Sequence, residues 1–187
     1  MTKDLIIGVR ACLFTLLLCA VLYPLFALAF GQLVVPDLAQ GSLIRDASGQ
    51  VVGSRLMAQA FERPEYLWPR PSAVGYNAAA TGGSNLAPSN PALTERAAGA
   101  VTLLSATSEH PAPGELVAAS GSGMDPHITL DGALYQMSRI ASARGLAPAR
   151  IEDLMRAHAS PNPWSPTLVN VLETNIALDG SFGRVGH

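Results

Sequence analysis

Residues 11–30 read ACLFTLLLCAVLYPLFALAF, twenty residues without a charge, and this stretch decides how the rest of the chain is organised. A helix rises about 1.5 Å per residue, so these residues would span roughly 30 Å, the thickness of the hydrocarbon core of a bilayer. The sequence therefore predicts a transmembrane helix over 11–30. Its interruptions are Thr15, whose hydroxyl can bond back to its own helix, and Tyr23 and Pro24. Because neighbouring helices often absorb a proline kink, Pro24 favours a helix that packs against other membrane helices.

The charges that flank this helix predict its orientation. The α-amino group, Lys3 and Arg10 precede it, against a single acid, Asp4. Cytoplasmic flanks of membrane helices carry an excess of Lys and Arg. We therefore expect residues 1–10 in the cytoplasm and residues 31–187 outside, as a periplasmic domain.

A cleaved signal peptide is the alternative interpretation of the same N-terminus. A basic start, an apolar run and the sequence Ala27-Leu28-Ala29, which matches an A-x-A cleavage site, follow in the right order. The apolar run is longer than the roughly 7–15 residues of a typical signal core. Its length favours an uncleaved anchor.

Composition excludes several classes of function for residues 31–187. Both cysteines lie within the apolar stretch, so the outer part has no disulfide and no cysteine-ligated metal. The chain has 12 basic and 14 acidic residues. Lys3, Arg10 and Asp4 precede residue 31, so the outer part has ten basic and thirteen acidic residues, a net charge of −3. That balance argues against nucleic acid as a partner, because nucleic-acid binding needs a basic face.

Lys3 is the only lysine in the chain. A Walker A loop needs a lysine on the phosphates, and no G-x-x-x-x-G-K occurs. A Schiff-base enzyme is excluded for the same reason. The DKTGT phosphorylation motif of P-type ATPases is also absent. The chain does not phosphorylate itself by these routes.

The first half of the outer part predicts a hairpin, a loop and a helix. Two β-rich runs, 42–44 and 50–52, flank a turn at 46–49 that ends in glycine. The stretch TGGSNLAPSNP, residues 81–91, holds too many glycines and prolines for a helix or a central strand. Asn90 then caps a helix whose first residue is proline. Apolar residues fall on one face of that helix, at positions 93, 97, 101 and 104.

The second half predicts mostly helix. Residues 116–128, LVAASGSGMDPHI, form a second glycine-rich loop in which Asp125-Pro126 is typical of a helix start. A helical stripe runs from 130 to 141 and ends at Gly145, and Pro148 opens a further helix. Residues 168–178 predict a short apolar helix or strand, and the tail after them is expected to fray. Short strands followed by helices indicate one α+β domain over 31–187.

Several blocks of this sequence are distinctive when taken together. They are Gly41-Ser42-Leu43-Ile44, Arg70-Pro71-Ser72-Ala73, Tyr76-Asn77, TGGSNLAPSNP at 81–91, LVAASGSGMDPHI at 116–128 and VNVLETN at 169–175. These blocks resemble the C subunit of the Kdp potassium-transporting ATPase. The resemblance is collinear from the apolar stretch to about Leu178, with small departures at Met57-Ala58 and Leu67-Trp68.

This resemblance implies a non-catalytic accessory subunit of an ATP-driven potassium uptake complex in the bacterial inner membrane. Its implied partners are a P-type ATPase subunit that hydrolyses ATP with Mg, a channel-like subunit that binds the transported K⁺, and a small single-span subunit. The family's subunit is needed for assembly and activity. A role as a catalytic chaperone, which raises the nucleotide affinity of the ATPase subunit, has been proposed for it. No cofactor is expected on this chain itself.

The resemblance also suggests nucleotide-binding residues. Thr81-Gly82-Gly83-Ser84 is similar to the glycine-rich signature of ABC transporters, whose backbone amides hold phosphate, and Asn85 follows it. The predicted orientation, however, places this loop outside the cytoplasm, away from ATP. We therefore favour action through assembly, in which the span and the outer domain fix the relative geometry of the partner subunits.

Aromatic residues and arginine dominate protein–protein contacts, which makes the segment around RPSA a candidate partner interface, although core packing explains its aromatic residues equally well. The candidate interface residues are Tyr23, Pro24, Trp68, Arg70, Tyr76 and Asn90.

A membrane-anchored or secreted periplasmic hydrolase that uses Ser122 and His127 is the alternative function. These residues lie close in sequence to Ser120 and Asp125, but no G-x-S-x-G is present, and catalytic groups usually converge from distant parts of a chain. We expect Asp125 to cap a helix instead. The histidines, at 110, 127, 158 and 187, lack metal-ligand spacing, so no metal site is expected.

Overall fold

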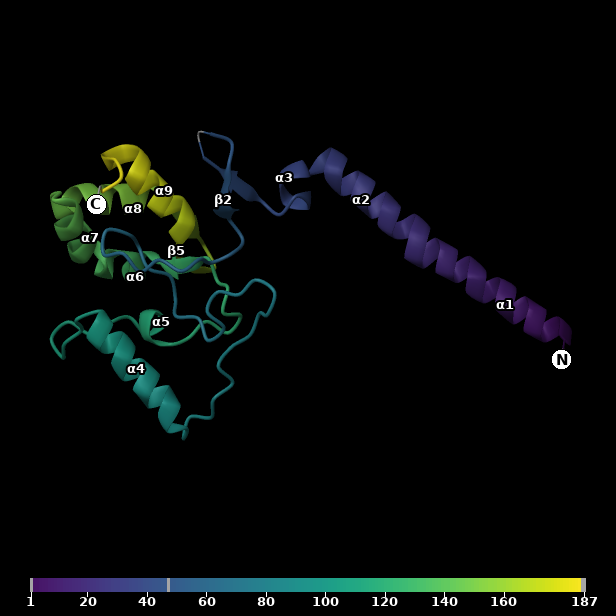
Figure 1. Cartoon of the computed structure of the whole chain (residues 1–187), viewed down its shortest axis with the longest axis horizontal. Coiled ribbons are helices and arrows are strands. Elements are labelled where there is room, and N and C mark those ends of the chain that lie inside the picture. Colours follow the sequence, from purple (N-terminus) through teal and green to yellow (C-terminus); the bar gives the residue numbers. More distant parts are fainter. Residues whose placement is uncertain (1, 47, 186–187) are drawn as a thin grey trace. The chain divides into compact units, whose positions relative to one another are not determined.

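The structure is a computed structural model that describes residues 2–46 and 48–185. The chain divides into two compact units, Met1–Leu43 and Ile44–His187 (Figure 1). The helices are α1 (Thr2–Leu16), the π-helical turn η1 (Leu17–Leu22), α2 (Tyr23–Val34), α3 (Pro36–Ala39), α4 (Pro91–Leu103), α5 (Gly114–Val117), α6 (Leu130–Tyr135), α7 (Met137–Arg144), α8 (Pro148–Ala157) and α9 (Val171–Phe182). The strands are β1 (Leu43–Arg45), β2 (Val51–Ser54), β3 (His127–Thr129), β4 (Ala159–Asn162) and β5 (Ser165–Asn170).

The first unit is dominated by an apolar helix that includes the predicted span. Segments α1, η1 and α2 run without interruption from Thr2 to Val34, 33 residues, and none of these residues is buried. Among the described residues this is the one helix that is long and apolar enough to cross a membrane. The helix extends beyond the predicted range 11–30 at both ends, because residues 2–10 and 31–34 are helical as well.

Pro24 alters this helix locally. The π-helical turn η1 ends two residues before it. Proline has no N–H to donate, and its ring crowds the carbonyl four residues earlier, so the preceding turn widens from α to π. The Thr15 hydroxyl lies 3.0 Å from the carbonyl oxygens of Ala11 and Cys12, as its sequence context predicted. The expected packing of Pro24 against other membrane helices stays a prediction.

The predicted hairpin is confirmed as the two-stranded sheet β1–β2. The Asp46 carboxylate accepts the backbone N–H of Ser48 at 2.9 Å and of Gln50 at 3.0 Å, which closes the turn. The Ser48 hydroxyl also donates to Asp46 and lowers the pKa of that carboxyl. Gly49 has φ 83°, the left-handed conformation that glycine adopts freely. Ala47 lies outside the described residues.

The core of the second unit lies between an antiparallel sheet and its helices. The strand order is β3–β5–β4, with Ile128 opposite Val169 in the β3–β5 pair. Helices α6 and α9 contact β5, and α8 contacts α6, α7 and α9 (Figure 1). The α+β prediction is therefore confirmed. The apolar residues of this core that have no exposed surface are Leu67, Ile128, Ala133, Ile140, Ile151, Met155, Val169 and Leu178.

Asp125-Pro126 does not begin a helix, and the sequence prediction is wrong there. The Asp125 carboxylate accepts the N–H of His127 at 3.0 Å, and the chain continues into strand β3. Helix α6 starts later, where the Thr129 hydroxyl accepts the N–H of Gly132 at 3.0 Å. The strand forms because its partner is β5, about forty residues away, and no local pattern near 125 reports that pairing.

The predicted continuous helix over 130–141 is two helices that meet at Gln136. Gly145 ends the second one with φ 65°, as predicted. The stretch 168–178, expected as a helix or a strand, is both: β5 runs to Asn170, whose side chain accepts the N–H of Glu173 at 3.1 Å and starts α9. The tail was expected to fray after Leu178, but α9 continues to Phe182.

Candidate partner-binding site

An irregular segment, residues 62–76, crosses the second unit and carries three of the six predicted interface residues, Trp68, Arg70 and Tyr76. Two buried amide side chains make the backbone hydrogen bonds that a neighbouring strand would otherwise make. Asn175 accepts the N–H of Leu67 at 2.8 Å and donates to its carbonyl at 2.9 Å. Gln136 does the same for Trp68, at 2.9 and 3.1 Å. Asn and Gln carry one acceptor and one donor group, so each can satisfy both polar groups of a single residue.

Arginine side chains support the other side of this segment. The Arg139 guanidinium lies 3.4 Å from the centroid of the Trp68 ring, and the Trp68 indole N–H donates to the carbonyl of Arg63 at 3.0 Å. Burial lowers the pKa of Arg139 to about 10. Arg144 donates to the carbonyl of Glu65 at 2.8 Å and to the Asp179 carboxylate at 2.8 Å. The segment is therefore pinned by α7 although it has no regular structure of its own.

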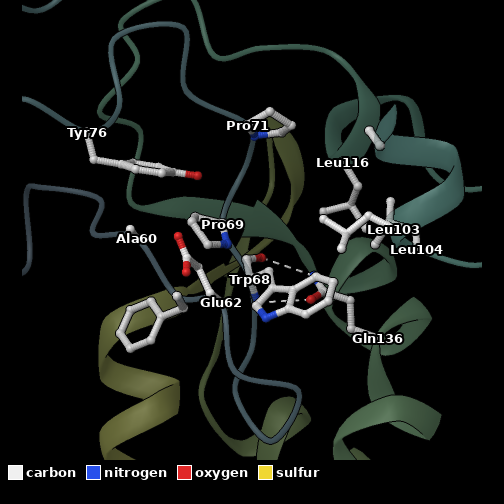
Figure 2. Close-up of a pocket in the computed structure, with 12 residues that line it drawn as sticks. Ala60, Glu62, Trp68, Pro69, Pro71, Tyr76, Leu103, Leu104, Leu116 and Gln136 are labelled. Atoms are coloured by element: carbon white, nitrogen blue, oxygen red, sulfur yellow. Dashed lines mark hydrogen bonds between the residues drawn. The ribbon is translucent and has the colours of Figure 1, made fainter. Parts of the chain in front are cut away.

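A cavity of about 500 Å³ opens beside this segment, and we call this cavity the α4 pocket. Figure 2 shows Leu103, Leu104 and Leu116 on one side of it and Ala60, Glu62 and Tyr76 on the other, with Trp68 between them. Its lining residues are Ala60, Phe61, Glu62, Trp68, Pro69, Pro71, Tyr76, Ala100, Leu103, Leu104, Leu116 and Gln136. The lining is mainly apolar, and Glu62, which is exposed, is its one charged member among the described residues.

The structure brings two of the predicted interface residues, Trp68 and Tyr76, to this pocket. Tyr76 has φ 57° and is held by its N–H, which donates to Ser72 Oγ at 3.0 Å. Its hydroxyl donates to the carbonyl of Arg70 at 3.0 Å, and burial raises the pKa of Tyr76. Arg70 itself points elsewhere and pairs with Asp125 at 3.1 Å.

Helix α4 forms one wall of the pocket, and its apolar residues are only partly covered. None of its residues, all of which the structure describes, is buried, and Leu103 is 65 % exposed. Asn90 caps it by accepting the N–H of Ala92 at 3.0 Å, as predicted. The predicted apolar face exists in the sequence, but the domain covers only part of it, because α4 follows a long loop and contacts the rest mainly through α5. Such an uncovered apolar face is typical of a site for another protein.

The two glycine-rich loops pack against each other, which sequence reasoning did not foresee. The N–H of Gly82 donates to the carbonyl of Ser122 at 2.8 Å. A Cβ added to Gly83 would lie 3.0 Å from the carbonyl oxygen of Gly121. Gly123 has φ +69°, and a Cβ there would lie 2.8 Å from the carbonyl oxygen of Gly82. Paired glycines in both loops were the available signal, since only glycine lets two backbones approach this closely.

This packing determines where the predicted nucleotide-binding residues lie. The Gly82 N–H is engaged within the domain, and Gly83 faces the neighbouring backbone. Thr81 and Asn85 are exposed, and Ser84 is half-buried. Residues 81–85 are not among the described residues that line the α4 pocket. Their role toward nucleotide stays a prediction.

Ser122 and His127, the residues of the hydrolase alternative, have separate partners. The Ser122 hydroxyl lies 3.3 Å from that of Ser120 and accepts the N–H of Met124 at 3.1 Å. The His127 ring lies 3.9 Å from the Asp125 carboxylate, which also pairs with Arg70. This is not a nucleophile held by a base. Within residues 2–46 and 48–185 no group of His, Cys, Asp and Glu is placed to hold a metal ion, and His187 lies outside the described residues.

Comparison with known proteins agrees with the resemblance seen in the sequence. Residues 5–180 match the family model described as KdpC: K⁺-transporting ATPase, c chain. The "Potassium-transporting ATPase KdpC subunit" of Parvibaculum lavamentivorans is 48 % identical over 180 residues, 95 % of this chain and 96 % of that protein.

Two further proteins with the same description are somewhat less similar to this chain. That of Pseudomonas aeruginosa is 44 % identical over 180 residues, 96 % of this chain and 98 % of that protein. That of Myxococcus xanthus is 41 % identical over 191 residues, 98 % of this chain and 90 % of that protein. With the apolar N-terminal helix and the α+β unit after it, these matches show that the chain belongs to the KdpC family, the c chain of the K⁺-transporting ATPase, and is a subunit of a complex rather than an enzyme by itself.

Proposed function

We propose that this chain holds the subunits of a potassium uptake complex in their working arrangement. Its helix spans the bacterial inner membrane, with residues 1–10 in the cytoplasm and 31–187 in the periplasm. Its partners are the P-type ATPase subunit, the channel-like potassium-binding subunit and the small single-span subunit. ATP and Mg bind the ATPase subunit, and K⁺ passes through the assembly.

The observation that carries this proposal is the α4 pocket. Its apolar wall includes Leu103, which is 65 % exposed and is not part of the buried core. Apolar area that a domain leaves in water is stabilised when a partner covers it, by about 25 cal/mol per Å². Glu62 at the rim suits a partner segment that is apolar and carries one basic side chain. The uncovered apolar helix 2–34 offers a second surface, for lipid and for partner helices.

Any effect on nucleotide affinity then arises through the assembly. The chain has no lysine after Lys3, and the Gly82 N–H is engaged with Ser122. A phosphate cradle at residues 81–85 would need free backbone amides. We infer that the subunit biases the conformation of the ATPase subunit by differential contacts rather than by touching ATP.

Co-purification in mild detergent tests the assembly role. The tagged full chain should bring down a P-type ATPase whose potassium-stimulated hydrolysis depends on it. Leu103→Asn removes an apolar contact at the α4 pocket, and we expect the recovered partner subunits to fall at least tenfold, the equivalent of about 1.4 kcal/mol. Leu56→Asn is the matched control, because Leu56 is 54 % exposed and lies outside the pocket lining. Equal recovery with both variants would exclude the pocket as the contact.

The nucleotide question has its own test in the assembled complex. We expect the double variant Thr81→Ala with Ser84→Ala to leave the KM for ATP unchanged. A raised KM with an unchanged kcat would instead assign ground-state nucleotide binding to this loop. The purified chain alone should hydrolyse neither ATP nor esters.

A further inference from the structure

The hairpin between β4 and β5 ends in an unusual tip. Trp164 is 93 % exposed, the highest value among the large hydrophobic side chains of the described residues. Its backbone is nevertheless fixed, because its N–H donates to Asn162 Oδ1 at 2.9 Å and the strands pair as far as Asn162 and Ser165. The indole is therefore presented to its surroundings on a fixed turn.

The sequence around this tip is free of charge. No Asp, Glu, Lys or Arg occurs between Arg156 and Glu173, although such residues make up 14 % of the chain. Three prolines, at 161, 163 and 166, stiffen the tip and reduce the conformational entropy that it would lose on docking. An uncharged, stiff tip with one large ring can leave water without desolvating an ion.

We infer that Trp164 docks into the headgroup region of the membrane that the chain's own helix crosses. Tryptophan is enriched at membrane–water interfaces, where its ring contacts the acyl chains and its N–H meets water. Nine residue steps from Val34 to Leu43 reach at most about 30 Å, so the hairpin's unit remains tethered near the bilayer. A weak contact then suffices, since the tether supplies a high effective concentration.

A lipid interface fits the tip better than a protein partner does. A single ring at a convex turn needs a medium that closes around it, and fluid lipid does so without a matching pocket. A protein hot spot, in contrast, is surrounded by further contacts that exclude water. The Trp164 neighbours are small or proline and offer few such contacts. The docked hairpin would restrict rotation of its unit over the membrane.

Fluorescence quenching on the full chain tests this inference. The chain has only two tryptophans, Trp68 and Trp164. In phosphatidylcholine–phosphatidylglycerol vesicles that carry lipid brominated near the headgroup, we expect the Trp164 emission to fall by about half, as for an interfacial indole. The wild-type chain and the Trp164→Ser variant give this contribution by difference, with no change near the core. Trp68→Phe isolates the same signal directly, and Trp164→Phe is the matched control that retains Trp68.

The outcomes separate lipid from water and from protein. Quenching by brominated lipid that vanishes in Trp164→Ser supports docking. Strong quenching of Trp164 by iodide with none by brominated lipid overturns it, because the ring then lies in water. If Trp164 escapes both quenchers only after the ATPase and channel-like subunits are co-reconstituted, a protein surface receives it and the lipid assignment is wrong. The comparison of the wild-type chain with Trp164→Ser leaves the lining of the α4 pocket unaltered, and the Leu103→Asn experiment tests that pocket separately.

Discussion

Gly123 and Gly121 stand two residues apart in one loop, yet a methyl group has different consequences at each. Gly123 has φ +69°, and an added Cβ would lie 2.5 Å from a Val74 methyl and 2.8 Å from the carbonyl oxygen of Gly82. At Gly121 an added Cβ meets nothing within 4 Å. We predict that Gly123→Ala lowers the free energy of unfolding by about 1–3 kcal/mol, from backbone strain and overpacking, and that Gly121→Ala changes it by less than about 0.5 kcal/mol.

Urea unfolding of the detergent-solubilised chain, followed by tryptophan fluorescence, measures both variants. Equal effects would mean that the two glycine loops do not pack as described.

The guanidinium of Arg144 donates several hydrogen bonds within the second unit. Its side chain is 1 % exposed and donates to the carbonyls of Glu65 and Gly183 and to the Asp179 carboxylate. Arg144→Ala removes the donor of the Glu65 carbonyl, whereas Asp179 keeps the Tyr66 hydroxyl and Arg184. We therefore predict a loss of about 1–3 kcal/mol in the free energy of unfolding. Arg156→Ala, which breaks an exposed pair with Glu152, should cost less than about 0.5 kcal/mol.

The same urea titration compares the arginine variants. Arg144→Lys is informative as well, because an ammonium cannot reproduce the planar guanidinium fork, so most of the loss should persist. Full stability in that variant would argue that charge alone matters here.

Tyr76 makes the free energy of unfolding depend on pH in the alkaline range. Burial raises the pKa of Tyr76 above its unfolded value of 10.0. The folded state then binds the phenolic proton more tightly, so this stability is present below pH 10 and is lost as pH rises from there through the folded pKa. We predict that unfolding free energy falls less steeply above pH 10 in Tyr76→Phe than in the wild-type chain. Identical slopes would show that Tyr76 ionises without penalty in the folded protein.

At the scale of elements, the two asparagine helix caps contribute differently to the stability of the second unit. Asn90 caps α4, none of whose residues, all described, is buried. Asn170 caps α9, is 8 % exposed and also donates to the carbonyl of Arg55 at 2.9 Å. We predict that Asn90→Ala raises amide exchange in α4 only, at a local cost of about 1 kcal/mol, whereas Asn170→Ala lowers the stability of the whole unit by about 2 kcal/mol or more.

Hydrogen exchange followed by mass spectrometry resolves the two responses. Faster exchange across β5 and α8 in Asn90→Ala would mean that α4 is part of the cooperative core, contrary to its exposure.

The helices and strands also show which features short sequence patterns predict and which they do not. Asn90-Pro91 and Gly145 fixed the ends of α4 and α7 because cap chemistry acts over a few residues. Strand β4 was missed, since Pro161 is compatible only with an edge strand and the pairing with β5 decides whether one forms. The glycine loops were recognised as loops, but their contact with each other joins residues about forty positions apart.

At the scale of the whole molecule, the charge flanks predict that residues 1–10 stay in the cytoplasm. In a background with Cys12→Ala and Cys19→Ala, a membrane-impermeant maleimide should label Ser108→Cys in spheroplasts, because Ser108 is exposed. Thr2→Cys should react only after permeabilisation. Labelling in the reverse order would contradict the predicted orientation, and release of a soluble chain shortened at Ala29 would establish the signal-peptide alternative.

The sequence by itself determined the apolar N-terminal helix, the hairpin, the capped helices and the family, because hydropathy and cap chemistry are local and the family's blocks are collinear. Only the tertiary structure decided that Asn175 and Gln136 hold the 62–76 segment, that the glycine loops meet, and that Trp68 and Tyr76 share the α4 pocket. These contacts join residues far apart in the chain, and their energy comes from burial and from satisfying buried polar groups. No local pattern records such pairings, so they exist only once the domain has folded.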